Sequence, residues 1–195
     1  LVAAIHEVKD GGIVRVSNFN ISSSASVKPV VDALVWAMQE RHATVRIVMD
    51  QAQNVATSKT TWLSQNGAEV RFLNGITYSN SFGAAAGIMH SKIVAVDDQV
   101  VFTGSNNFSS TGFVANEENS VVLRAPENAT RIASFLCDID TMFQIGVPAG
   151  QPQQVLLHLE PHGVERVNPH PAHVVVLPGV HPVQRRAEPV EEPCH

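Results

Sequence analysis

The sequence predicts an α/β protein in which a mixed, largely parallel β-sheet is flanked by helices and followed by an extended tail. Three observations support this fold class. Short apolar runs of strand character alternate with helical apolar periodicity through most of the chain. Two neighbouring apolar runs separated by polar turn residues indicate a hairpin. Nine of the 11 prolines and six of the nine histidines lie from Pro148 onward, which marks a change of organisation.

The first half of the chain alternates strands with helices. A strand is predicted over 13–16, and a helix follows over 27–42, with Ser26 as its expected N-cap. Pro29 suits the first turn of that helix, where no backbone N–H donor is needed. The apolar residues that share one face of the helix are Val27, Val31, Leu34 and Met38.

Two further strands and a short helix complete this half. The runs 45–49 and 70–73 are strongly apolar and predict strands. Between them a short helix is predicted over 58–66, and Gly67 ends it. The alternation of strand and helix predicts largely parallel strands.

The second half begins with a hairpin and ends in a long helix. The hairpin arms are 93–96 and 100–102, and 97–99 form the turn. A strand at 120–123 precedes the helix. The apolar stripe that predicts this helix consists of Ile132, Phe135, Leu136, Ile139, Met142 and Phe143.

We therefore divide the chain into a domain over 1–146 and a Pro/His-rich extension over 147–195, partly irregular in structure. The extension contains two His pairs at spacings that zinc or nickel could use, 158/162 and 170/173. Since no Cys or acidic residue completes either set, we expect a solvated tail. We predict neither a metal site nor a cofactor.

Composition narrows the class of protein. An apolar content of 44% and a charged content of 16% are typical of a soluble globular protein. No apolar run approaches the ~18 residues that a membrane span requires. The formal net charge of −5 argues mildly against tight binding to duplex nucleic acid, because such binders usually carry a basic surplus.

The start of the chain and its two cysteines bear on the compartment, which stays undetermined. The chain starts at Leu1 without a basic-then-apolar leader, so we interpret it as a processed product or an excised piece. Cys137 is expected to be a small buried residue of the long helix. A Cys137–Cys194 bridge would require an oxidising compartment, such as the periplasm or the exterior after secretion.

One stretch, MHSKIVAVDDQVVFTGSNNF from Met89 to Phe108, concentrates the residues capable of chemistry. Side chains two apart on a strand point the same way, so His90 and Lys92 share a face, as do Ser105 and Asn107. All four are expected at one rim of the sheet. An ammonium and an amide suit the holding of anionic oxygens, and a neutral imidazole suits attack or proton transfer. The set indicates phosphoryl transfer that needs no metal.

The complete spacing resembles the HKD signature of the phospholipase D superfamily. The matching pattern is His90-x-Lys92-x4-Asp97-x6-Gly104-Ser105-x-Asn107. Segments 45–50 and 66–71 resemble two strand regions of that family, and 116–119 resembles the acidic segment after the signature. The resemblance covers about residues 1 to 145 and leaves the tail unexplained.

This resemblance implies a phospholipase D-like fold and a covalent mechanism. His90 would be the nucleophile and would form a phosphohistidine. Lys92 and Asn107 would hold the non-bridging phosphate oxygens. Glu118, with Glu117 as the alternative, would hydrogen-bond the far ring nitrogen of His90 and so fix its tautomer.

Two other signature residues have supporting roles in this interpretation. Ser105 would support the hydrogen-bond network around the histidine. Asp97 belongs to the signature, but its place at the hairpin turn favours a structural role over proton transfer.

Members of the superfamily use two signatures, and this chain contains one. We expect a two-fold dimer in which the two copies of His90 face each other, as in single-signature nucleases of the family. The alternative is that an upstream segment carries the second half of the site.

The substrate is expected to be a phosphodiester, either nucleic acid or phospholipid. Small size and a single signature favour a nuclease, whereas the acidic balance and 6% aromatic content do not. Phospholipid hydrolysis or head-group transfer would use segment 76–89 as an apolar entrance. The alternative, which we prefer slightly, is a small-residue loop packed against the site. An inactive binding domain is a third hypothesis, which the intact His90, Lys92 and Asn107 disfavour. Whether water or an alcohol completes the reaction stays undetermined.

Overall fold

A mixed β-sheet separates two layers of helices in the computed structural model, which describes residues 1–55, 58–80 and 83–149. The strands are β1 (Ile13–Asn18), β2 (Thr44–Asp50), β3 (Glu69–Asn80), β4 (Gly83–Ile88), β5 (Ile93–Val96), β6 (Val100–Gly104), β7 (Ser120–Arg124) and β8 (Val147–Pro148). The helices are α1 (Val2–Ile5), α2 (Lys28–Glu40), the 3₁₀ helix η1 (Gln51–Gln53), α3 (Lys59–Gln65), α4 (Ser110–Val114) and α5 (Ala129–Ile145).

The strand order is β4-β3-β2-β1-β5-β6-β7, with β8 paired to β3. The pairs β1–β2 and β2–β3 are parallel, as the strand–helix alternation predicted. The other pairs among the described residues are antiparallel. The mixed sheet flanked by helices is therefore confirmed, but antiparallel pairs outnumber parallel ones because β5, β6 and β7 follow one another as a meander.

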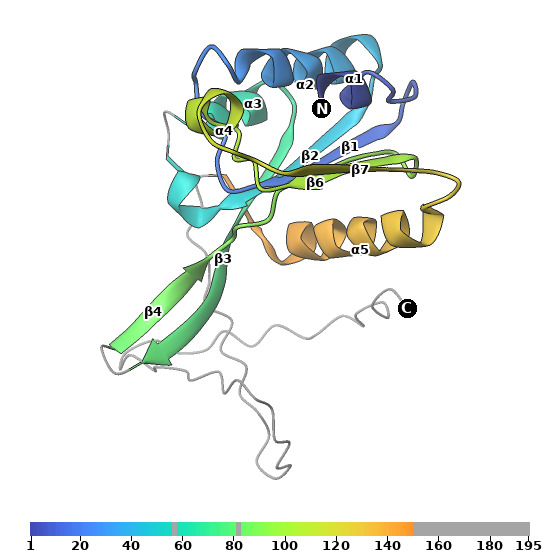
Figure 1. Ribbon diagram of the computed structural model, residues 1–195. Coiled ribbons are helices and arrows are strands. Elements are labelled where there is room, and N and C mark those ends of the chain that lie inside the picture. Colours follow the sequence, from blue (N-terminus) through green and yellow to red (C-terminus); the bar gives the residue numbers. More distant parts are fainter. Residues whose placement is uncertain (56–57, 81–82, 150–195) are drawn as a thin grey trace, which may run out of the picture.

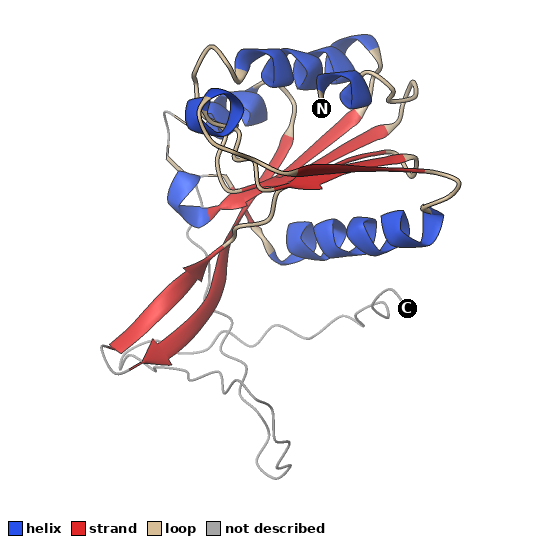
Figure 2. Ribbon diagram, in the orientation of Figure 1, coloured by secondary structure: helices blue, strands red, loops and turns tan. Residues whose placement is uncertain are grey.

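The two faces of the sheet are covered by different helices (Figures 1 and 2). Helices α1 to α4 lie on one side and enclose the larger apolar core, to which α2 contributes Val31 and Leu34. Helix α5 covers the opposite face, where Ile132 and Ile139 pack on β5 and β6. These are residues of the predicted apolar stripes. Within the described residues no helix combines the length and the apolar character of a membrane span.

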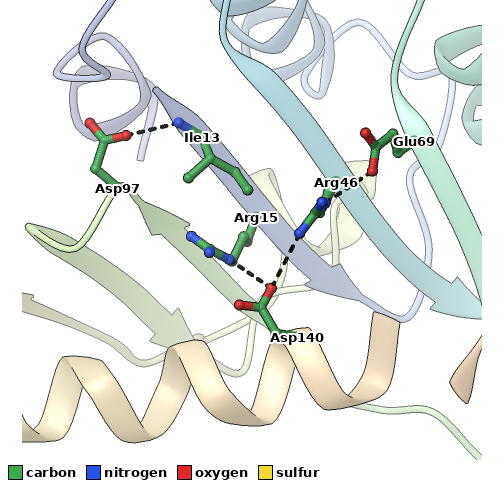
Figure 3. Close-up of polar contacts among 6 residues, drawn as sticks. All are labelled: Ile13, Arg15, Arg46, Glu69, Asp97 and Asp140. Carbon is green, nitrogen blue, oxygen red and sulfur yellow. Dashed lines mark hydrogen bonds and ion pairs between the residues drawn. The ribbon is translucent and has the colours of Figure 1, made fainter. Parts of the chain in front are cut away.

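Ion pairs connect α5 to strands β1 and β2 (Figure 3). Asp140 of α5 lies 2.8 Å from Arg15 Nε on β1 and 3.9 Å from Arg46 Nη1 on β2. Arg46 Nε also donates to Glu69 of β3 at 3.0 Å. Partly exposed ion pairs of this kind contribute about 0–1 kcal/mol each, so they add little to the stability of the α5 packing.

One local expectation needs correction, and the structure adds detail to two others. Helix α2 has Val27 at its N-cap with no side-chain cap, because the Ser26 hydroxyl hydrogen-bonds the Ser24 hydroxyl at 3.1 Å. Much of the segment around 76–89 belongs to β3 and β4, which form a long hairpin that projects away from the body of the domain (Figure 1). The sheet also includes β8, just past the expected boundary at residue 146. The tail from 150 to 195, with its histidine pairs and Cys194, lies outside the described residues.

Candidate active site

Five strand ends meet at one edge of the sheet, which we call the active-site rim. It consists of the last residues of β1, β2 and β6 and the first residues of β5 and β7. The registers define it, since Ser17 pairs with Ile93, Ile93 with Thr103, and Gly104 with Ser120. The predicted site residues that lie at this rim are His90, Lys92, Ser105, Asn107 and Glu118.

His90 and Lys92 precede β5 and differ sharply in exposure. The His90 side chain is exposed, and its ring lies 5.4 Å from the ring of Phe19 at an angle of 59°. Lys92 is only 8% exposed, and its Nζ donates to the backbone carbonyl of His90 at 2.7 Å. Burial lowers the pKa of Lys92, and the negative charge of Glu118 opposes that effect. The ammonium is thus held beside the backbone of the histidine.

Backbone contacts between β6 and β7 explain the Gly-Ser pair of the signature. A Cβ on Gly104 would collide with the carbonyl oxygen of Asn119, so only glycine permits this approach. Ser105 N then donates to Asn119 O at 3.0 Å, and Asn119 N donates to Ser105 Oγ at 3.0 Å. The Ser105 hydroxyl in turn donates to Glu118 Oε2.

Hydrogen bonds at this rim distinguish Glu118 from its alternative, Glu117. Besides the bond from Ser105, Glu118 Oε1 accepts a hydrogen bond from Asn116 Nδ2 at 2.9 Å. These two donors, followed by the charge of Lys92, lower the pKa of Glu118. Glu117 is exposed, and no hydrogen bond joins Glu118 to the ring of His90 among the described residues. The carboxylate therefore lies within the Ser105–Lys92 network rather than on the imidazole.

Asn107 lies in the turn after β6, and a neighbouring buried amide holds that turn. Asn18, fully buried at the end of β1, donates to Asn106 O at 3.2 Å and accepts from Phe108 N at 3.2 Å. Asn107 Oδ1 is itself buried and has no hydrogen-bond partner within the described part of the chain. This oxygen is an acceptor and cannot itself bind a phosphate oxygen, so a role in phosphate binding would fall to the Nδ2 donor of the same amide.

Asp97 lies at the opposite end of β5, five residues and about 17 Å along the strand from Lys92. Its carboxylate accepts a hydrogen bond from Ile13 N at 2.8 Å (Figure 3). It also accepts one from Lys9 N at 3.0 Å. A Cβ on Gly12 would collide with that carboxylate. Asp97 therefore ties the hairpin turn to the start of β1, and this geometry favours the structural role expected for it.

Sequence reasoning missed three residues that shape the rim: Asn18, Phe19 and Asp50. Asp50 is 2% exposed and accepts hydrogen bonds from Met89 N at 2.7 Å and from Ala52 N at 3.0 Å. It therefore fixes the backbone immediately before His90. Polar residues that end an apolar strand are the one sequence signal that marks Asn18 and Asp50. No group of three or more potential metal ligands occurs among the residues with described positions.

Comparison with known proteins assigns this fold and site to a family. A family model described as "Cardiolipin synthase, PLD-like domain" matches residues 1–138. The chain therefore belongs to the phospholipase D superfamily, as the signature predicted. The predicted class of activity, a phosphodiester hydrolase of that superfamily, follows from this membership.

Among the solved structures that are similar to this chain, two are compared with it below. NucT from Helicobacter pylori is 22% identical, with a TM-score of 0.60 over 75% of this chain and 87% of that one. Nuc from Salmonella typhimurium, a phospholipase D family member, is 26% identical, with a TM-score of 0.54 over 75% of this chain and 86% of that one. A comparison with curated proteins finds no match.

Proposed function

We propose that the protein is a metal-independent phosphodiesterase that cleaves nucleic acid as a two-fold dimer through a phosphohistidine on His90. The observation that carries the proposal is the common location of His90, Lys92 and Asn107 at the active-site rim, with Lys92 hydrogen-bonded to the carbonyl of His90. An imidazole beside a buried ammonium and an amide is suited to an anionic phosphodiester.

In the first step a ring nitrogen of His90 attacks phosphorus, and the bond from phosphorus to the leaving oxygen breaks. The leaving oxygen takes a proton from a second imidazole. In the second step that imidazole removes a proton from water, the water oxygen attacks phosphorus, and the phosphorus–nitrogen bond breaks. Each step is an in-line displacement at phosphorus. The covalent intermediate replaces one displacement that has a high barrier by two that have lower barriers. Lys92 and Asn107 hold the non-bridging oxygens in both.

Glu118 and Ser105 support the nucleophile in this proposal. A neutral imidazole attacks through one nitrogen only when its other nitrogen carries the proton. Glu118 is the carboxylate we assign to that N–H in the working enzyme, because its oxygens accept hydrogen bonds from side chains. The carboxylate of the buried Asp50 instead accepts from backbone N–H groups. The lowered pKa of Glu118 keeps it ionised for this role.

The second imidazole comes from a second copy of the chain. The other histidines of the described domain, His6 and His42, lie at α1 and after α2, away from the strand ends of the rim. A two-fold axis at the rim would bring two copies of His90 together. The alternative source is an upstream segment with a second signature.

Nucleic acid is the substrate we favour, because two of the similar solved structures carry the names NucT and Nuc. The small size of the chain and its single signature also favour a nuclease. A second candidate is phospholipid head-group transfer or hydrolysis. The description of the matching family model as a cardiolipin synthase domain favours it.

The test uses the full chain with EDTA present and three substrates in parallel: bis-p-nitrophenyl phosphate, plasmid DNA and phosphatidylcholine vesicles. We expect cleavage of the generic diester and of DNA, abolished by His90→Ala. Cleavage of lipid but not DNA would replace the nuclease by the second candidate. Loss of all activity in EDTA, restored by a divalent ion, would contradict the metal-independent mechanism.

A further inference from the structure

The orientation of the His90 ring is not explained by hydrogen bonds in this structure. A nucleophilic imidazole must present one nitrogen in line with the bond that breaks, which fixes the ring to within about 10–20°. The second torsion of a histidine side chain has broad minima, so an exposed ring does not hold such an orientation alone. Glu118 accepts from Ser105 and Asn116 instead of from the imidazole. In the arrangement seen here, a contact with another side chain can restrain the ring, whereas the hydrogen bond to Glu118 belongs to the proposed working enzyme.

Phe19 supplies that contact. Its ring centroid lies 5.4 Å from that of His90 at an interplanar angle of 59°. Both values fall in the range that favours tilted aromatic pairs, in which the positive edge of one ring meets the electron-rich face of another. Lys92 Nζ lies 6.0 Å from the same Phe19 centroid, at the limit of cation–π attraction. One side chain thus contacts both the nucleophile and the cation that binds phosphate.

The backbone of Phe19 is well placed for this role because the residue before it is rigidly held. Asn18 is completely buried and bonded to both Asn106 and Phe108 in the turn that carries Asn107. Its Oδ1 also accepts from Asn20 N at 3.4 Å, so hydrogen bonds hold the chain on both sides of Phe19. A ring mounted on so fixed a segment can restrict its neighbour.

We propose that Phe19 is a positioning residue that sets the His90 imidazole for attack and aligns it with Lys92. The inference rests on the proposed function of His90. Phe19 touches no reacting atom in this account. It acts by limiting the rotation of the nucleophilic ring, so its loss lowers the rate of the chemical step more than it lowers substrate binding.

A matched contact elsewhere in the fold provides the control. His6 is exposed like His90, and its ring lies 4.6 Å from the ring of Trp36 at 65°. Trp36→Leu therefore removes an aromatic ring from beside an exposed histidine outside the rim. Phe19→Leu removes the ring at the rim and keeps apolar volume, whereas Phe19→Tyr keeps the ring.

The first measurement needs no activity. In a proton NMR spectrum the ring current of Phe19 displaces the imidazole signals of His90, which are identified by their loss in His90→Ala. We expect Phe19→Leu to remove this displacement and Phe19→Tyr to retain it, with the His6 signals changing only in Trp36→Leu. Identical His90 signals in the wild type and Phe19→Leu would overturn the contact.

The second measurement is the pre-steady-state rate of phosphoenzyme formation with bis-p-nitrophenyl phosphate. We expect Phe19→Leu to slow it about ten- to a hundredfold, with KM changed less than threefold and Phe19→Tyr restoring the rate to within threefold of wild type. Trp36→Leu should leave it within twofold. Equal rates for Phe19→Leu and Trp36→Leu, at equal thermal stability, would overturn the proposal for Phe19 alone. Phosphoenzyme that persists in His90→Ala would instead overturn the proposed function.

Discussion

Lys92 carries its charge in a position that is almost closed to water, and this affects both stability and catalysis. Burial lowers its pKa in the folded protein below the ordinary 10.5. Between the two values the unfolded chain binds a proton that the folded chain has lost, so this residue makes stability rise with pH in that window. Because of the same shift, Lys92 loses its charge, to which we assign phosphate binding, at a lower pH than an exposed lysine does.

We therefore predict that kcat/KM for a generic diester falls at alkaline pH with an apparent pKa below 10.5. The measurement is a pH–rate profile with bis-p-nitrophenyl phosphate, whose own ionisation does not change in this range. A profile that stays flat beyond pH 10.5 would show that no buried lysine charge is needed.

Glu118 is distinguished from its neighbour Glu117 by its contacts. We predict that Glu118→Gln lowers the cleavage rate by about 10²-fold, since the proposed function assigns this carboxylate to the orientation of the catalytic imidazole. It should also move the alkaline limb to lower pH, because the charge that raises the pKa of Lys92 is gone. Glu117→Gln is the matched control and should stay within twofold of wild type. Equal effects of the two substitutions would contradict the assignment.

At the scale of elements, the β5–β6 hairpin is attached to the rest of the sheet at both ends. At its open end β5 pairs with β1 and β6 pairs with β7. At its turn the Asp97 carboxylate accepts hydrogen bonds from the backbone of Lys9 and Ile13. Asp97 has a φ of +51°, in the left-handed region that Asp and Asn tolerate better than most residues. The turn residue thus combines a required backbone conformation with two hydrogen bonds.

We predict that Asp97→Ala lowers the free energy of unfolding by about 2–4 kcal/mol, because two backbone N–H groups lose a charged acceptor. The folded fraction should keep near wild-type kcat. Asp98→Ala, at the exposed neighbouring position, should change stability by less than about 0.5 kcal/mol. Denaturant unfolding and active-site-normalised kinetics make the comparison. A loss of kcat without a loss of stability in Asp97→Ala would restore a catalytic role.

The elements that sequence could predict are those with a strong apolar period. The hairpin arms and α5 follow such patterns, and each is confirmed within a few residues. The β3–β4 hairpin was missed because 76–88 is rich in Gly, Ala and Ser, without alternation of apolar and polar residues. The N-cap of α2 was missed because hydrogen bonds among neighbouring serines compete with capping.

The candidate site was predictable where its residues are close in sequence. His90, Lys92, Ser105 and Asn107 are held by one hairpin, so their spacing alone predicts their proximity. The contact of Phe19 with His90 depends on the pairing of β1 with β5, which no local pattern specifies. Such long-range partners need the assembled sheet.

At the scale of the whole molecule, the account requires two copies of His90 for one reaction. We predict the activity after wild-type chains are mixed with an equal amount of His90→Ala and allowed to reassociate. It should be about one quarter of that of the same total amount of wild-type protein, because a shared site needs a histidine from each chain. Independent sites would leave about one half. Sedimentation of the same samples should show dimers as the active species, and a fully active monomer would contradict the two-fold arrangement.

The most direct test of the central claim is the capture of phosphate on His90. The chain is mixed with a diester that leaves a labelled phosphoryl group, quenched in alkali within the first turnover, digested and analysed by mass spectrometry. The account predicts acid-labile label on the peptide that contains His90, formed as fast as the burst of leaving group and absent from His90→Ala. A full burst of leaving group with no label on that peptide would contradict it.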